Sequence, residues 1–245
     1  MKTCLLIGLV ALGIATVGCR KAPARSDAAP AATVARGSLR GHVRLNGPVP
    51  VNPTIRMNAD PMCTRASAGQ PIRYEAVIAA ADGGLANAFV ELVGTFPETA
   101  VPADPVRIDQ RACVYRPRVV GLRLGQTLKV SNSDDGLHNV HSVSTARDRF
   151  NIAQPIAGLV NDFRPRDPGM LQLKCDVHTW MVAFVGVVDH PFFAVTDTDG
   201  SFTLHDVPEG TYGLQTWHER FGIKTMQVRV EGGKDSALDI EYESH

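Results

Sequence analysis

Two short segments that lie far apart in the chain carry the side chains that most constrain its fold. In the CDVHTWM segment, two residues separate Cys175 from His178, and two more separate His178 from Met181. The LHNVH segment contributes His138 and His141. A thiolate, imidazoles and a thioether at such spacings suit one metal ion. We therefore expect a tight ligand loop between two strands, with a distant histidine joining it through the ion.

The mixture of donors favours copper among the possible metals. Cupric ion binds imidazole readily and cuprous ion prefers sulfur, so two histidines, a cysteine and a weak methionine serve both oxidation states. Zinc is the main competitor, because tetrahedral cysteine and histidine sites are common. Methionine is a poor zinc ligand, however, and Met181 stands in register with the other loop donors. A cysteine and a histidine alone would be weak evidence, since either residue can be structural.

The sequence around these segments resembles the cupredoxins, the family of plastocyanin and azurin. The strand GQTLKVSNSD, the LHNVH corner and the CDVHTWM loop carry the resemblance, which covers about residues 106–189. The short loop is most similar to that of the amicyanin type. The resemblance implies a Greek-key β-barrel or sandwich with one type 1-like copper ion. Its implied ligands are His138, Cys175, His178 and, as the long axial ligand, Met181.

The resemblance also implies roles for the neighbours of the ligands. Asn139 would hydrogen-bond to the cysteine loop and so orient the ligands, although making the turn is a further role that it can have. We expect His141 at the surface or in packing. The alternative that His141 binds in place of His138 stays open.

In the family, the loop histidine that corresponds to His178 is exposed within a small apolar patch through which electrons pass. Thr179, Trp180 and Ala183 would form this patch here. Trp180 is equally well explained as an anchor of the core, because tryptophan is mostly buried wherever it lies.

A second resemblance lies on both sides of the copper region. Residues 37–43 and 85–92 look like opening strands, and 196–204 with 207–214 match a DxDGxF…VPxGxY signature. This pattern resembles the carboxypeptidase-regulatory-like sandwich, akin to transthyretin. We expect the copper domain to be inserted between its halves, with two tandem domains as the alternative. The acidic turn at Asp197 and Asp199 lacks the ligand set of a calcium loop. The single His218-Glu219 pair does not indicate catalysis, because neighbouring residues of a strand face opposite sides.

The amino terminus predicts export. An apolar run shorter than a membrane span follows Lys2 and ends before Cys19, as in a secretory signal. TVGC resembles the lipobox of bacterial lipoproteins, which implies that Cys19 is acylated; cleavage into a soluble periplasmic form is the alternative. The predicted division is a signal peptide (1–18), a linker (19–37), a β segment (38–105), the cupredoxin domain (106–189) and a second β segment (190–245).

The cysteines agree with an oxidising compartment. With Cys4 in the signal, Cys19 at the anchor and Cys175 on copper, Cys63 and Cys113 remain. They are candidates for a disulfide that could stabilise the fold by about 3 to 5 kcal/mol. Two buried free thiols are the alternative.

Composition limits the other possibilities. The 245 residues include 22 glycines and 16 prolines and no convincing long helix, which predicts an all-β chain with two small domains. Lys plus Arg equals Asp plus Glu at 25 each, so no overall field attracts nucleic acid or a membrane surface. We expect no enzyme, but an electron-transfer protein whose partner is a redox protein such as a cytochrome. The alternatives are copper storage or delivery to a donor or acceptor protein, and a structural or carbohydrate-binding sandwich with a degenerate copper site.

Overall fold

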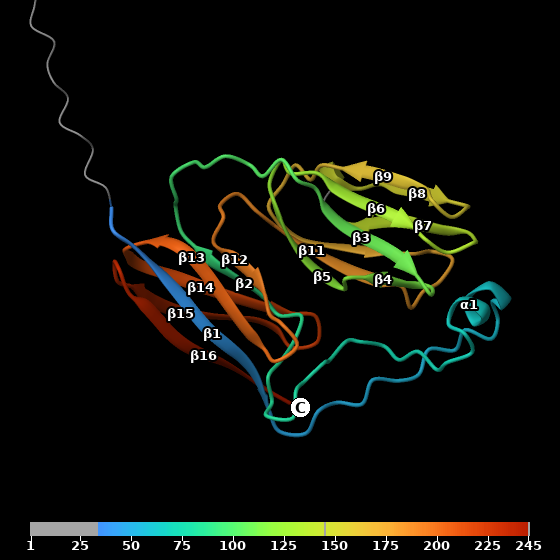
Figure 1. The fold of residues 1–245 in the computed structure, drawn as a ribbon, viewed down its shortest axis with the longest axis horizontal. Coiled ribbons are helices and arrows are strands. Elements are labelled where there is room, and N and C mark those ends of the chain that lie inside the picture. Colours follow the sequence, from blue (N-terminus) through green and yellow to red (C-terminus); the bar gives the residue numbers. More distant parts are fainter. Residues whose placement is uncertain (1–33, 145, 245) are drawn as a thin grey trace, which may run out of the picture. The chain divides into compact units, whose positions relative to one another are not determined.

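The computed structural model describes residues 34–144 and 146–244, which are all-β apart from two short helical segments (Figure 1). The helical segments are α1 (Pro61–Ala66) and η1 (Ala146–Asp148). The predicted all-β, sandwich-type fold class is confirmed. The signal peptide, Cys19 and most of the linker lie outside the described residues.

Seven strands from both ends of the described chain form one pair of sheets, here called the flanking sandwich. Its sheets have the strand orders β13-β1-β16 and β12-β2-β14-β15. The strands are β1 (Arg36–Asn46), β2 (Phe89–Val93), β12 (Phe193–Val195), β13 (Ser201–Pro208), β14 (Gly210–His218), β15 (Gly222–Val230) and β16 (Asp235–Glu243). In β1, Leu39, Val43 and Leu45 are buried while Arg40 is exposed, as the twofold period of a strand requires.

The strands between β2 and β12 form a second pair of sheets, here called the inserted sandwich. Its sheets have the orders β4-β3-β6-β9 and β5-β11-β10-β7-β8. The strands are β3 (Val106–Arg111), β4 (Val114–Arg116), β5 (Val119–Arg123), β6 (Leu128–Asn132), β7 (His138–Val143), β8 (Asn151–Gln154), β9 (Val160–Phe163), β10 (Gly169–Lys174) and β11 (Val182–Val188). The chain order is therefore that of an insertion and not of two sandwiches in tandem.

The connection between β1 and β2 does not stay with the flanking sandwich. Ile55, Met57 and Cys63 from this connection belong to the buried core of the inserted sandwich. Within the connection, Asp60 caps α1 by accepting the N–H groups of Met62 and Cys63, and a proline occupies the first helical turn. The predicted 38–105 segment is thus divided between the two sandwiches, because its middle part carries apolar side chains that cover the second core.

The two sandwiches pack against each other where aromatic rings fill the space beside two glycines. Gly121 in β5 and Gly186 in β11 are register partners. A Cβ atom at Gly121 would lie 2.3 Å from the ring of Phe193, and one at Gly186 would lie 2.4 Å from the ring of Phe89. Glycine is required at both positions because only a backbone without a side chain admits these rings.

Candidate metal centre

Hydrogen bonding between strands brings the two predicted ligand segments together. Strand β7, which begins at His138, pairs with β10, and the residue after β10 is Cys175. The loop that follows is closed by its backbone, since the Cys175 N–H donates to Met181 O (3.2 Å) and the Met181 N–H to His178 O (2.9 Å). The loop and the start of β7 therefore lie at the same end of the inserted sandwich.

Three donor atoms converge in the interior at this end. His138 Nδ1 lies 3.0 Å from His178 Nδ1, and Cys175 Sγ lies 3.8 Å from His178 Nδ1. Donor atoms of all three residues lie within 4.8 Å of one another. Their side chains are almost fully buried, at 0%, 2% and 1% exposure for His138, His178 and Cys175. Nitrogen and sulfur donors bound to one ion at about 2.0 and 2.3 Å lie about 3 to 4 Å apart, so the arrangement fits a single metal ion.

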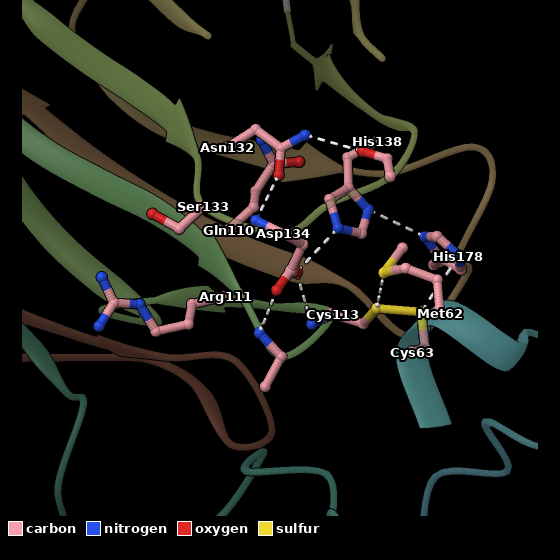
Figure 2. Close-up of polar contacts among 12 residues, drawn as sticks. Met62, Cys63, Gln110, Arg111, Cys113, Asn132, Ser133, Asp134, His138 and His178 are labelled. Atoms are coloured by element: carbon pink, nitrogen blue, oxygen red, sulfur yellow. Dashed lines mark hydrogen bonds and ion pairs between the residues drawn. A yellow bond between two sulfur atoms is a disulfide. The ribbon is translucent and has the colours of Figure 1, made fainter. Parts of the chain in front are cut away.

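A carboxylate lies within hydrogen-bond distance of the outer nitrogen, Nε2, of each histidine. Asp134 Oδ2 lies 2.9 Å from His138 Nε2, and Asp60 Oδ2 lies 2.9 Å from His178 Nε2. Figure 2 shows the rings of His138 and His178 turned toward one another, with Asp134 on the other side of His138. A carboxylate only accepts hydrogen bonds, so each Nε2 carries a proton and each Nδ1 of a neutral ring keeps its lone pair.

Two lone pairs 3.0 Å apart need a cation between them. Without a metal this cation is a proton. Burial lowers the pKa of His138, but its hydrogen bonds to Asp134 and Cys175 outweigh burial and raise the pKa to about 9. Burial raises the pKa of Cys175, while its bonds to His138, His178 and the Asn139 N–H lower it to about 6. The lowered pKa of Cys175 favours its thiolate form, and a metal ion that binds the cluster would displace the protons that its donor atoms carry.

Two other predicted residues lie at the cluster. Met181 is fully buried in the same core as Cys175, and its backbone closes the loop as described above. Asn139 links the two ligand segments: its N–H donates to Cys175 Sγ (3.5 Å), and its side-chain oxygen accepts the Asp176 N–H (2.6 Å). These contacts are those expected of a residue that ties the strand to the cysteine loop.

His141, the alternative ligand, points elsewhere. Its Nδ1 lies 2.9 Å from both carboxylate oxygens of Asp176, and its side chain is 26% exposed. Strand alternation explains the difference, since residues at odd spacing on β7 face opposite sides. The structure therefore places His138, and not His141, in the donor cluster.

The structure joins Cys63 and Cys113 in a disulfide. Neither sulfur is then available as a thiolate ligand, although Cys63 Sγ lies 3.4 Å from His178 Nε2. The disulfide connects α1 to the turn between β3 and β4, where Ala112 and Cys113 both have positive φ and donate their N–H groups to Asp134. The disulfide thus joins α1, whose N-cap is Asp60, to the turn whose N–H groups hold Asp134 in place.

The expectation of an exposed loop histidine is wrong. His178 is only 2% exposed, because Asp60 and the first turn of α1 cover its outer edge. Ala183 is fully buried, so it does not contribute to a surface patch. Trp180 is partly buried against the core and donates its indole N–H to Cys113 O, which fits the role of a packing anchor. Of the expected patch, only Thr179 is exposed.

The site contains two residues that sequence reasoning missed. Asp134 lies four residues before His138, but a polar loop before a strand gives no sign that its carboxylate will meet an imidazole. Asp60 precedes a proline, which signals only a helix N-cap. Its contact with His178 spans 118 positions and depends on where the long connection packs.

Comparison with known proteins gives one partial family match. The model of the β-sandwich domain of ER membrane protein complex subunit 7 matches residues 178–244, which include β11 to β16. No curated protein matches the chain.

Several solved structures are similar to part of the chain. A purple cupredoxin from Nitrosopumilus maritimus is 22% identical, with a TM-score of 0.31, over 34% of this chain and 99% of that one. A copper(I) form of an amicyanin variant is 17% identical, with a TM-score of 0.31, over 40% and 98%. A copper-containing nitrite reductase from Thermus scotoductus SA-01 is 16% identical, with a TM-score of 0.31, over 61% and 28%.

Proposed function

We propose that this chain binds one copper ion through His138, Cys175 and His178, with Met181 as a weak fourth ligand, and that it transfers single electrons. The observation that carries the proposal is the buried convergence of two histidine Nδ1 atoms and one cysteine sulfur. The outer nitrogen of each histidine, Nε2, already has a carboxylate partner. Bound copper would supply a one-electron redox couple. The chain's own contribution is to fix the donors and exclude water, and we propose no enzymatic activity.

Copper is favoured over zinc by the donors and by their surroundings. One thiolate, two imidazoles and a buried thioether suit both oxidation states of copper, whereas a structural zinc site takes four strong donors. The ligands come from a strand end and a closed loop that are held by hydrogen bonds. A site that changes little between oxidation states favours electron transfer, and its burial disfavours a cargo that must be released readily.

The proposal is tested by loading the purified protein with cupric ion. We expect an intense visible absorption from thiolate-to-copper charge transfer and a reversible one-electron voltammogram. Cys175→Ser should abolish the colour, and Met181→Leu should shift the potential while keeping the colour. His138→Gln should lose the spectrum, whereas the matched control His141→Gln should keep it, because His141 bonds to Asp176 outside the cluster.

Other outcomes identify the competing functions. A colourless and redox-silent copper complex would point to copper storage or delivery. Tighter binding of zinc than of copper would indicate a zinc site. A chain that binds neither metal would leave a structural or carbohydrate-binding sandwich. Loss of all metal in Met181→Leu would overturn the weak axial role of this methionine.

We also propose an envelope location and a protein partner. The Cys63–Cys113 disulfide favours an oxidising compartment, which agrees with the signal and lipobox pattern before Cys19. In the two described ranges, no helix has the length and apolar character to cross a bilayer. We propose that the partner is a redox protein such as a cytochrome, and that the flanking sandwich is a carboxypeptidase-regulatory-like scaffold.

A further inference from the structure

The two aspartates at the outer edge of the histidines come from elements that carry no ligand. Asp60 is the N-cap of α1 in the long connection between β1 and β2, and Asp134 lies in the loop between β6 and β7. Each reaches a different imidazole at the same distance, 2.9 Å, and through the same ring atom, Nε2. This repeated geometry is a reason to treat the two carboxylates as a pair with one role.

Both carboxylates are held in place by bonds that do not involve the histidines. Asp60 uses Oδ1 to accept the Met62 N–H at 2.8 Å, which leaves Oδ2 for His178. Asp134 accepts the N–H groups of Ala112 and Cys113, each at 2.8 Å. Neither carboxylate can therefore turn away from its imidazole without breaking a cap or a turn.

A fixed carboxylate decides which nitrogen an imidazole offers to a metal. When Nε2–H donates to an acceptor, the lone pair stays on Nδ1, and the bond also orients the ring and raises its basicity. In this structure the Nδ1 atoms are the ones that face each other and the cysteine sulfur. The carboxylates thus select the atoms that converge.

The same two groups set the charge around the ion. Negative charge close to the ligands stabilises cupric over cuprous ion, and the effect grows as solvent is excluded. The side chain of Asp134 is 5% exposed and that of Asp60 is 30% exposed. Asp134 should therefore influence the site more strongly than Asp60.

We propose that Asp60 and Asp134 are positioning residues of the metal centre, each fixing Nδ1 of one histidine as the metal-binding atom and together lowering the reduction potential. This inference rests on the proposed copper site and adds a control of its ligand geometry and potential. It also assigns a role in that site to a connection from outside the inserted sandwich.

The test replaces each aspartate by asparagine, which removes the charge and keeps the size. We expect Asp134→Asn to weaken the preference for cupric over cuprous ion about tenfold, an upward shift of about 59 mV for one electron. Asp60→Asn should shift the potential in the same direction by less. Asp109→Asn is the matched control, because Asp109 is a partly buried carboxylate that bonds to Ser131, Ser133 and Arg111 and to neither histidine.

Ring-nitrogen NMR of the cuprous protein, which is diamagnetic, provides a readout that a purely structural role would not move. Wild type should show slowly exchanging Nε2–H signals for both histidines. Asp60→Asn should perturb the signal of His178 only, and Asp134→Asn that of His138 only. Asp60→Ser, which can still cap α1 but is too short to reach the ring, should reproduce the effect of Asp60→Asn and separates it from helix loss.

Two results would overturn the inference. One is protonation of Nδ1 in place of Nε2 on both rings in the wild type, and the other is a potential shift no larger than that of Asp109→Asn. If the wild type bound no copper, the proposed function would fail by itself. The positioning roles would still be decided by the Nε2–H signals of the metal-free protein and its two variants.

Discussion

At the scale of single residues, His218 in β14 makes the folded state sensitive to acid. It is 1% exposed, accepts the Arg220 N–H on Nδ1, and its Nε2 has no hydrogen-bond partner among the described residues. Burial, with a contribution from the nearby Arg118, lowers its pKa from 6.5 to about 4. As the pH drops from about 6.5 to 4, His218 therefore becomes protonated in the unfolded chain but not in the folded chain. The free energy of unfolding falls over this range and is constant below it.

The size of this effect can be measured with one variant. A pKa shift of this extent is worth about 3 kcal/mol of unfolding free energy. His218→Asn keeps an acceptor near Arg220 and should remove most of the dependence of the unfolding free energy on pH in this range. Urea unfolding of the metal-free protein between pH 7 and 4 measures it. The control is His42→Asn, a histidine on β1 whose side chain is 42% exposed. Equal slopes in wild type and His218→Asn would contradict the assignment.

That His138, Cys175 and His178 lie close together could be predicted from the sequence, but the residues that contact their outer edges could not. His138, Cys175 and His178 lie in short motifs whose spacing already places donors on a strand end and one loop. Asp60 and Asp134 reach the site through the packing of a long connection and the shape of a turn, which no local pattern encodes. The same packing explains why His178 is buried although the family resemblance implied exposure.

At the scale of elements, the Cys63–Cys113 disulfide attaches α1 to the inserted sandwich. The helix is one short segment in which Cys63 is the only buried residue. The disulfide closes a loop of 50 residues, which should stabilise the fold by about 4 kcal/mol through the entropy of the unfolded chain. A helix so short would not be stable without this attachment.

Replacing both cysteines by alanine tests this dependence. We expect the metal-free double variant to lose about 4 kcal/mol of unfolding free energy in urea, and the amides of Thr64 and of the C-cap Ser67 to exchange faster with solvent. Wild type treated with a reducing dithiol serves as the comparison and should behave alike. Unchanged exchange in α1 would mean that the contact of Asp60 with His178 suffices to hold the helix.

At the scale of the whole molecule, the two sandwiches pack against each other where aromatic rings lie against glycines. Motifs on both sides of residues 106–189 indicated from the sequence that this region could be inserted, yet the sequence could not reveal that Gly186 admits the ring of Phe89. Four buried residues, Phe89, Val119, Phe184 and Val188, form a separate core where β2 meets β5 and β11. The partly buried pair of Arg118 and Glu219 adds an ion pair between the same two sandwiches, with Arg118 Nη2 donating to Glu219 Oε2 at 2.8 Å.

A double-mutant cycle tests this packing. Gly186→Ala places a methyl group 2.4 Å from the Phe89 ring, so we expect a loss of about 1 to 3 kcal/mol in unfolding free energy. Phe89→Ala alone should cost more, because it leaves a cavity, but the double variant should cost clearly less than the sum. Gly213→Ala is the control, since its nearest neighbour would be the Val93 side chain at 3.3 Å. Additive losses would show that the ring does not need the glycine. An unchanged copper spectrum in all variants would show that the metal centre depends on its local donors and not on contact between the sandwiches.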